Sequence, residues 1–169
     1  MINIEINDRE VLDALEGLVR RLGNMSPAMQ DIGELLAESA IQRFSDGVGP
    51  DGEAWKENSP ATILAYVDKY KGSRSKRGGL TKKGQTRAGS KKPLIGETKS
   101  LSTMIHYSAG RDRVEIGSPQ VYAAVQQFGA KRGQFGAAPW GDIPARPFLG
   151  VSDSDKGSIL AIVSGYMLP

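Results

Sequence analysis

The chain has 169 residues and a formal net charge of +3, with 39% hydrophobic and 24% charged residues. These values suit a single folded domain over residues 1–169 and exclude a fully disordered chain. No apolar run approaches the ~20 residues that a membrane-spanning helix needs, so we expect no membrane partner. The absence of cysteine excludes disulfides, thiolate zinc sites, iron–sulfur clusters and cysteine nucleophiles.

The N-terminal part of the chain predicts a strand and two helices. Residues 2–6 alternate apolar and polar side chains, which predicts a short strand; they lack the features of a signal peptide, so we expect the protein to stay in the cytosol where it is made. Asn7 with Glu10 forms a capping box for a helix that ends at Gly23. Ser26 and Pro27 then begin a second helix that reaches about residue 45.

Residues 46–52 are rich in glycine, proline and aspartate and predict a loop. They match the dinucleotide pattern G-x-G-x-x-G, but they follow a helix rather than a strand and contain Pro50, which favours a plain loop. Trp55 fits either an anchor of the core or a ligand platform, and the core is favoured. Ser59 and Pro60 predict a third helix that ends near residue 70.

Residues 71–93, hereafter the basic segment, have an unusual composition. They contain five glycines and no acid or aromatic residue, and their only apolar residues are Leu80 and Ala88. Such a segment buries too little apolar surface to offset its ordering entropy, which predicts a long, mobile loop. Outside it the chain has 13 basic and 19 acidic residues, a net charge of −6. The nine cations of the segment are Lys71, Arg74, Lys76, Arg77, Lys82, Lys83, Arg87, Lys91 and Lys92.

Two interpretations of the basic segment remain open from the sequence. Its cations could contact DNA phosphates without sequence preference or contact an acidic partner protein. Alternatively, it is a solvated loop that charge keeps soluble. The absence of aromatic residues argues against a protein that reads single strands by stacking.

The C-terminal half predicts a mixture of short elements. We expect a short helix near residues 100–104, followed by a hairpin whose strands are residues 105–109 and 113–117. Ser118 and Pro119 predict a helix that ends at Gly129. Its expected buried face consists of Val121, Ala124, Val125 and Phe128.

The chain then continues through a glycine-rich loop at residues 130–142 and a last strand at residues 147–151. Asp153 or Ser154 is expected to cap a terminal helix. Helices and strands out of strict alternation predict the α+β class, with a small, mostly antiparallel sheet packed by several helices and the basic segment inserted as a flexible loop.

No motif makes a positive case for an enzyme. His106 is the only histidine, which excludes multi-histidine metal sites, and it lacks a neighbouring nucleophile motif. Residues 84–91 approach the phosphate-loop pattern, but Ser90 and Lys91 stand in reversed order. Residues 153–157 resemble the start of a calcium loop that lacks its final glutamate. We therefore expect no catalytic, cofactor-binding or metal-binding residues.

Several stretches together resemble the phage virion morphogenesis family, also called tail completion proteins, of Mu-like and other tailed bacteriophages. The resemblance implies a small α+β subunit without catalysis that assembles into a ring at the head–tail junction or the tail end of the virion. The matching stretches are Pro50-Asp51-Gly52 with Trp55, Pro93-Leu94, Leu101, Val114 to Ser118, Tyr122-Ala123, Gln127-Phe128-Gly129 and Ile143 to Gly150.

The resemblance also implies partners. We expect a homo-oligomer, a ring of six to match the sixfold tail, together with other tail and neck proteins. If the basic segment lines the lumen of this ring, its charge predicts non-specific contact with double-stranded DNA there. Arg146 is expected to remain available for a carboxylate, and Phe148 and Leu149 to point to opposite faces of a strand, one of them toward a neighbouring subunit. A simple edge strand is the alternative there. The expected interface residues are Phe135, Trp140, Arg146 and Phe148. A free nucleic-acid-binding protein that works through the basic segment is the alternative function.

Overall fold

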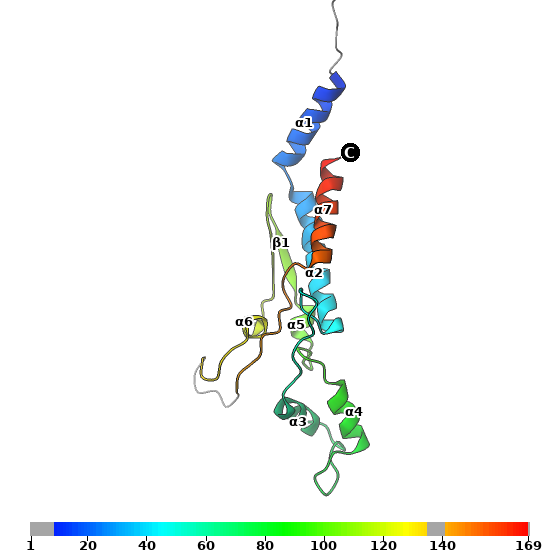
Figure 1. The fold of residues 1–169 in the computed structure, drawn as a ribbon, viewed down its shortest axis with the longest axis vertical. Coiled ribbons are helices and arrows are strands. Elements are labelled where there is room, and N and C mark those ends of the chain that lie inside the picture. The colour runs from blue at the N-terminus through cyan, green and yellow to red at the C-terminus, as the bar shows by residue number, and fades with distance from the viewer. Residues whose placement is uncertain (1–8, 135–140, 169) are drawn as a thin grey trace, which may run out of the picture. The chain divides into compact units, whose positions relative to one another are not determined.

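The computed structural model describes residues 9–134 and 141–168, which contain seven helices and one two-stranded antiparallel sheet (Figure 1). The chain is therefore mostly helical within the expected α+β class. It divides into two compact units. Unit 1 comprises residues 1–39, 106–117 and 151–169, and unit 2 comprises residues 40–105 and 118–150. Among the described residues, no helix combines the length and the apolar character needed to cross a membrane. The expected strand at residues 2–6 and the cap at Asn7 lie outside the described residues.

Unit 1 contains the first helix and the last, α1 (Arg9–Gly23) and α7 (Asp153–Met167), which contact each other. The Arg21 guanidinium donates to the Met167 carbonyl at 2.9 Å, and the Tyr166 hydroxyl donates to the Asn24 carbonyl at 2.6 Å. Because these bonds join segments 142 or more residues apart, they fix the C-terminal helix against the end of α1.

The N-cap of α7 is Ser152, not Asp153 or Ser154 as the sequence suggested. The Ser152 hydroxyl accepts from the Asp155 amide at 3.1 Å, and the Asp155 carboxylate accepts from the Ser152 amide at 2.8 Å. This reciprocal capping box satisfies two amides at once, so it determines where the helix begins.

The expected second helix and hairpin are also present. Helix α2 is Ser26–Asp46. Strands β1 (His106–Ala109) and β2 (Val114–Gly117) pair with Tyr107 opposite Ile116. The Tyr107 hydroxyl donates to the Glu34 carboxylate of α2 at 3.2 Å, and its ring lies over Gly33. The hairpin therefore packs on α2 at a position that has no side chain.

We expect Gly33→Ala to lower the free energy of unfolding by about 1–3 kcal/mol, because overpacking forces a neighbour to move. A Cβ at Gly33 would lie 2.2 Å from the Cδ2 atom of Tyr107. The matched control is Gly17→Ala in α1, where no atom lies within 4 Å of the new Cβ. It should gain helix propensity instead. Urea denaturation of both variants checks this, and equal stability of the two would contradict the close packing.

Unit 2 is organised around three aromatic rings. Phe44, at the end of α2, has its ring centroid 5.3 Å from those of both Trp55 and Phe148. All three side chains are buried, and the Trp55 indole donates to the Pro147 carbonyl at 2.8 Å. The interpretation of Trp55 as a core anchor is therefore confirmed.

The expected strand at residues 147–151 is wrong. Side chains, rather than a neighbouring strand, satisfy its backbone. The Arg43 guanidinium donates to the carbonyls of Phe148 and Gly150, both at 3.0 Å. The Gln127 amide oxygen accepts from the Phe148 amide at 2.9 Å and the Leu149 amide at 3.0 Å. With its backbone groups engaged in this way, the segment does not need a sheet partner.

Helix α6 (Ala123–Phe128) ends at Gly129 as expected, but its buried face was predicted wrongly. Val121 is 96% and Phe128 78% exposed, whereas Ala123 is buried. The face that turns inward is the one that carries Gln127, because that amide binds the backbone of residues 148 and 149. A hydrogen-bonding requirement thus overrides the apolar pattern of this short helix.

Candidate functional site

The basic segment of unit 2 follows helix α3 (Pro60–Asp68) and precedes the short helix α5 (Ser100–Thr103). The expectation of a loop without secondary structure is wrong here, since residues 82–90 form helix α4 (Lys82–Ser90). Before it, Arg74 and Leu80 form an isolated antiparallel bridge that closes a small turn. Helices α3 and α4 contact each other (Figure 1). The segment is therefore a turn and a helix packed on α3.

Thr81 explains why α4 begins where it does. Its hydroxyl oxygen accepts from the Gly84 amide at 3.1 Å as an N-cap and lies 2.7 Å from the Gly72 carbonyl. Few apolar residues follow it, so the periodicity used to predict helices is absent. The threonine before a run of helical residues was the one available signal.

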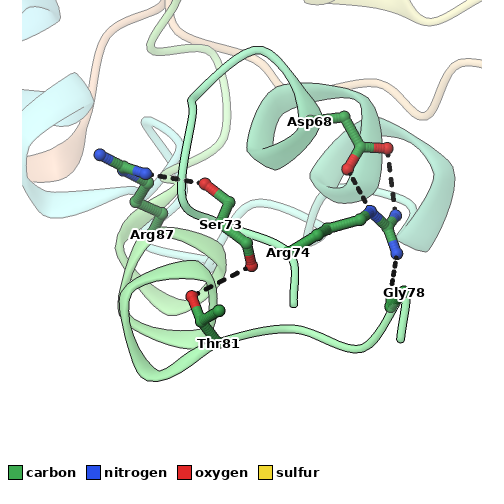
Figure 2. A network of polar contacts seen from close by, with 6 residues as sticks. All are labelled: Asp68, Ser73, Arg74, Gly78, Thr81 and Arg87. Atoms are coloured by element: carbon green, nitrogen blue, oxygen red, sulfur yellow. Dashed lines mark hydrogen bonds and ion pairs between the residues drawn. The ribbon is translucent and has the colours of Figure 1, made fainter. Parts of the chain in front are cut away.

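Ser73 is the buried centre of the segment, with 1% of its surface exposed. Its carbonyl accepts from the Thr81 amide at 2.9 Å. The same carbonyl accepts from the Thr81 hydroxyl at 3.2 Å, and the Ser73 hydroxyl oxygen accepts from the Arg87 guanidinium at 2.7 Å (Figure 2). A Cβ on Gly84 would lie 2.1 Å from the Ser73 carbonyl oxygen. Glycine is therefore required for α4 to approach this backbone.

Arg74 closes the turn from the other side. Its guanidinium binds both carboxylate oxygens of Asp68, at 2.5 and 3.1 Å, and donates to the Gly78 carbonyl at 2.9 Å (Figure 2). The hydrogen bond from Arg74 lowers the pKa of Asp68, and the same carboxylate raises the pKa of Arg74. This pair joins the end of α3 to the turn.

Two tyrosines in or just after α3 make cation–π contacts with side chains from the C-terminal part of the basic segment. Arg87 lies 4.9 Å above the Tyr70 ring, and Lys91 lies 4.9 Å above the Tyr66 ring. The Lys91 ammonium also donates to the Ile95 carbonyl, and burial lowers its pKa. Lys92 donates to the Ser45 carbonyl at 2.8 Å. Four of the nine cations, Arg74 included, therefore have partners inside unit 2.

The other five cations are exposed, and their side chains have no hydrogen bond or ion pair among the described residues. The two acids of residues 60–99 are already engaged, Asp68 with Arg74 and Glu97 with Lys69 at 3.2 Å. We call the five side chains the free cations of the basic segment. They are Lys71, Lys76, Arg77, Lys82 and Lys83.

The four residues expected at a subunit interface do not belong to the basic segment. Phe135 and Trp140 fall outside the described residues. Phe148 is completely buried in the aromatic core, and Arg146 is only 6% exposed. The Arg146 guanidinium donates to the carbonyls of Lys56 at 2.7 Å and Glu57 at 2.8 Å, and burial lowers its pKa. Arg146 is therefore not available for a carboxylate, because its guanidinium binds these two backbone carbonyls inside unit 2.

Unit 2 also has a cavity of about 680 Å³ whose wall includes Lys91, Ile143 and Arg146. Lys91 and Arg146 on this wall both bind backbone carbonyls. Within residues 9–134 and 141–168, no three His, Asp or Glu side chains are grouped so that they could hold a metal ion. His106 is exposed on β1. The basic segment therefore remains the strongest candidate for a functional surface.

Comparison with known proteins decides the family. The phage virion morphogenesis family matches residues 6–167. The chain belongs to this family. The match spans both units and includes the basic segment, so the resemblance expected from the sequence is confirmed.

A curated relative supports the same assignment. The Mu-like prophage FluMu G protein 2 of Haemophilus influenzae (strain ATCC 51907 / DSM 11121 / KW20 / Rd) is 29% identical over 167 residues, which cover 98% of this chain and 96% of the relative. The two proteins are thus similar along essentially their whole lengths. No solved structure matches the chain.

Proposed function

We propose that this member of the phage virion morphogenesis family is a non-catalytic structural subunit of the phage neck or tail. It assembles into a ring of six that terminates or completes the tail and joins it to the head. The family match over residues 6–167 carries this proposal. The ring places the protein in the virion, beside other tail and neck proteins, after assembly in the host cytoplasm.

The surface of α1 supports an assembly role. No residue of this helix is buried, although it carries a stripe of apolar side chains at helical spacing. Five of the six large ones, which form the exposed stripe, are between 51% and 68% exposed, and the sixth, Leu18, is half-buried. Contiguous apolar patches of this kind mark interaction sites, and in a ring the neighbouring copy would cover this stripe. Its members are Val11, Leu12, Leu15, Val19 and Leu22.

We expect the triple variant Leu12→Gln, Leu15→Gln, Val19→Gln to fold normally and to lose assembly. These side chains are exposed, so their replacement removes little buried surface from the isolated subunit. The matched control replaces three other exposed residues, all in unit 2, by glutamine: Leu64, Val121 and Phe128. Circular dichroism reports the fold and analytical ultracentrifugation reports assembly. Loss of assembly in the control alone would assign the contact to another surface.

Electron microscopy of the purified protein mixed with tail tubes tests the proposed function. We expect rings capping one end of the tubes, with sixfold symmetry in class averages. The protein is imaged alone and with tail tubes, because assembly can require a tail end as template; for the same reason the ultracentrifugation of the α1 variants is done with and without tail tubes. Absence of the protein from the tube ends would contradict the proposal.

A further inference from the structure

We propose that the five free cations of the basic segment bind the phosphate backbone of double-stranded DNA without sequence preference. This inference goes beyond the assembly role and depends on a different surface from the α1 stripe. Its failure would therefore leave the proposed ring untouched.

The charge around the free cations is strongly positive. Residues 60–99 contain eleven Lys or Arg and two acids, a net charge of +9, while the whole chain carries +3. Both acids are ion-paired, and they pair with cations other than the five. The free cations thus lack a carboxylate partner in this part of unit 2, and a polyanion would supply the missing negative charge.

The backbone that carries these cations is held in place by hydrogen bonds. Lys76 and Arg77 lie in the turn that Arg74 closes by donating to the Gly78 carbonyl, and Lys82 and Lys83 lie in the first turn of α4. The Ser73–Thr81 hydrogen bond joins the turn to the helix. Binding would consequently order only side chains, so less entropy is lost than for a loop without structure.

The side chains beside the free cations favour a nucleic-acid duplex as the partner. Protein interfaces depend on buried aromatic or apolar anchors, and single-stranded nucleic acid is read by aromatic stacking. Residues 71–83 contain no aromatic residue, and their one apolar side chain, Leu80, is half-buried. A surface of long cationic side chains without an anchor suits the dense phosphates of a DNA duplex, which are bound by charge alone.

The proposal predicts a strong dependence on salt. Each phosphate neutralised on duplex DNA adds about 0.9 to the slope of log affinity against log salt. Five contacts therefore give a slope of up to about −4.5, which is a loss of about 500-fold between 50 and 200 mM salt.

The experiment measures binding of the full chain to a fluorescent DNA duplex of random sequence by anisotropy across this salt range. The test variant replaces all five free cations by glutamine. The control replaces five other exposed cations of the same total charge, Arg20, Lys56, Arg111, Lys131 and Arg132. We expect the test variant to lose binding and most of the salt slope, and the control to keep the slope and most of the affinity.

Several outcomes would overturn the proposal: no binding by the native chain at 50 mM salt, an unchanged salt slope in the test variant, or an equal loss in test variant and control. Circular dichroism verifies that the variants fold. If the quintuple variant does not fold, the double variant Lys76→Gln, Arg77→Gln takes its place. It should reduce the slope of log affinity against log salt by about 2. Vesicles of anionic lipid serve as a competitor, and displacement of DNA by them would assign the surface to membranes instead.

Discussion

Replacing Phe148 by alanine is expected to lower the free energy of unfolding by about 3–5 kcal/mol, the range for a buried phenylalanine. The side chain has no exposed surface and stacks on Phe44 at a centroid distance of 5.3 Å. The change would leave a cavity beside the Phe44 ring and disturb the backbone that Arg43 and Gln127 bind.

Phe128→Ala is the matched control for this prediction. It removes the same atoms from a side chain that is 78% exposed, so the free energy of unfolding should change by less than about 0.5 kcal/mol. Urea denaturation of both variants provides the measurement. If Phe148 instead served mainly as a subunit contact, its replacement would spare the monomer and impair assembly.

The variant Arg146→Glu is expected to be destabilised by about 3–5 kcal/mol, the range for breaking a buried polar network and leaving an uncompensated charge. The native guanidinium satisfies the carbonyls of Lys56 and Glu57. A carboxylate there cannot donate to them and would face their negative ends. The expectation that Arg146 is an interface residue available for a carboxylate would instead predict an intact fold with a blocked interface.

Arg132→Glu is the control for Arg146→Glu, because the exposed side chain of Arg132 has no partner in the described part of the chain. Thermal unfolding should separate the two variants clearly. A melting temperature for Arg146→Glu equal to that of the control, combined with loss of assembly, would return Arg146 to the interface.

The elements predicted correctly from the sequence are those with strong local signals. Proline after a capping residue marked the starts of α2 and α3, and glycine marked the ends of α1 and α6. The hairpin followed from alternation around a turn at residues 110–112. These signals act within a few residues, so a single sequence contains them.

The elements that the sequence did not predict depend on long-range contacts. Arg43 binds backbone more than 100 residues away, and Gln127 holds residues 148 and 149. These side chains replace a sheet ladder, so residues that look like a strand form none. Helix α4 was missed because its stability comes from Thr81 and from packing on α3 rather than from an apolar stripe.

The candidate site, too, could be predicted only in part from the sequence. Composition alone located the cations of the basic segment, but it could not separate the four that hold unit 2 together from the five that are free. That distinction depends on Asp68, Ser73, Tyr66 and Tyr70, whose roles appear only when α3 and α4 are side by side. Likewise, residues 143–150 contribute buried side chains to the fold of unit 2, although Arg146 was expected to make a surface contact.

The central claim, that this protein completes the phage neck or tail, is tested most directly by disrupting its gene in the phage or prophage that encodes it. Electron microscopy of the particles produced provides the readout, with the native gene supplied in trans as the control. We expect filled heads and tails that are unjoined or lack a completed end, and restoration of whole virions by the native gene. Normal, infectious particles from the disrupted gene would contradict the claim.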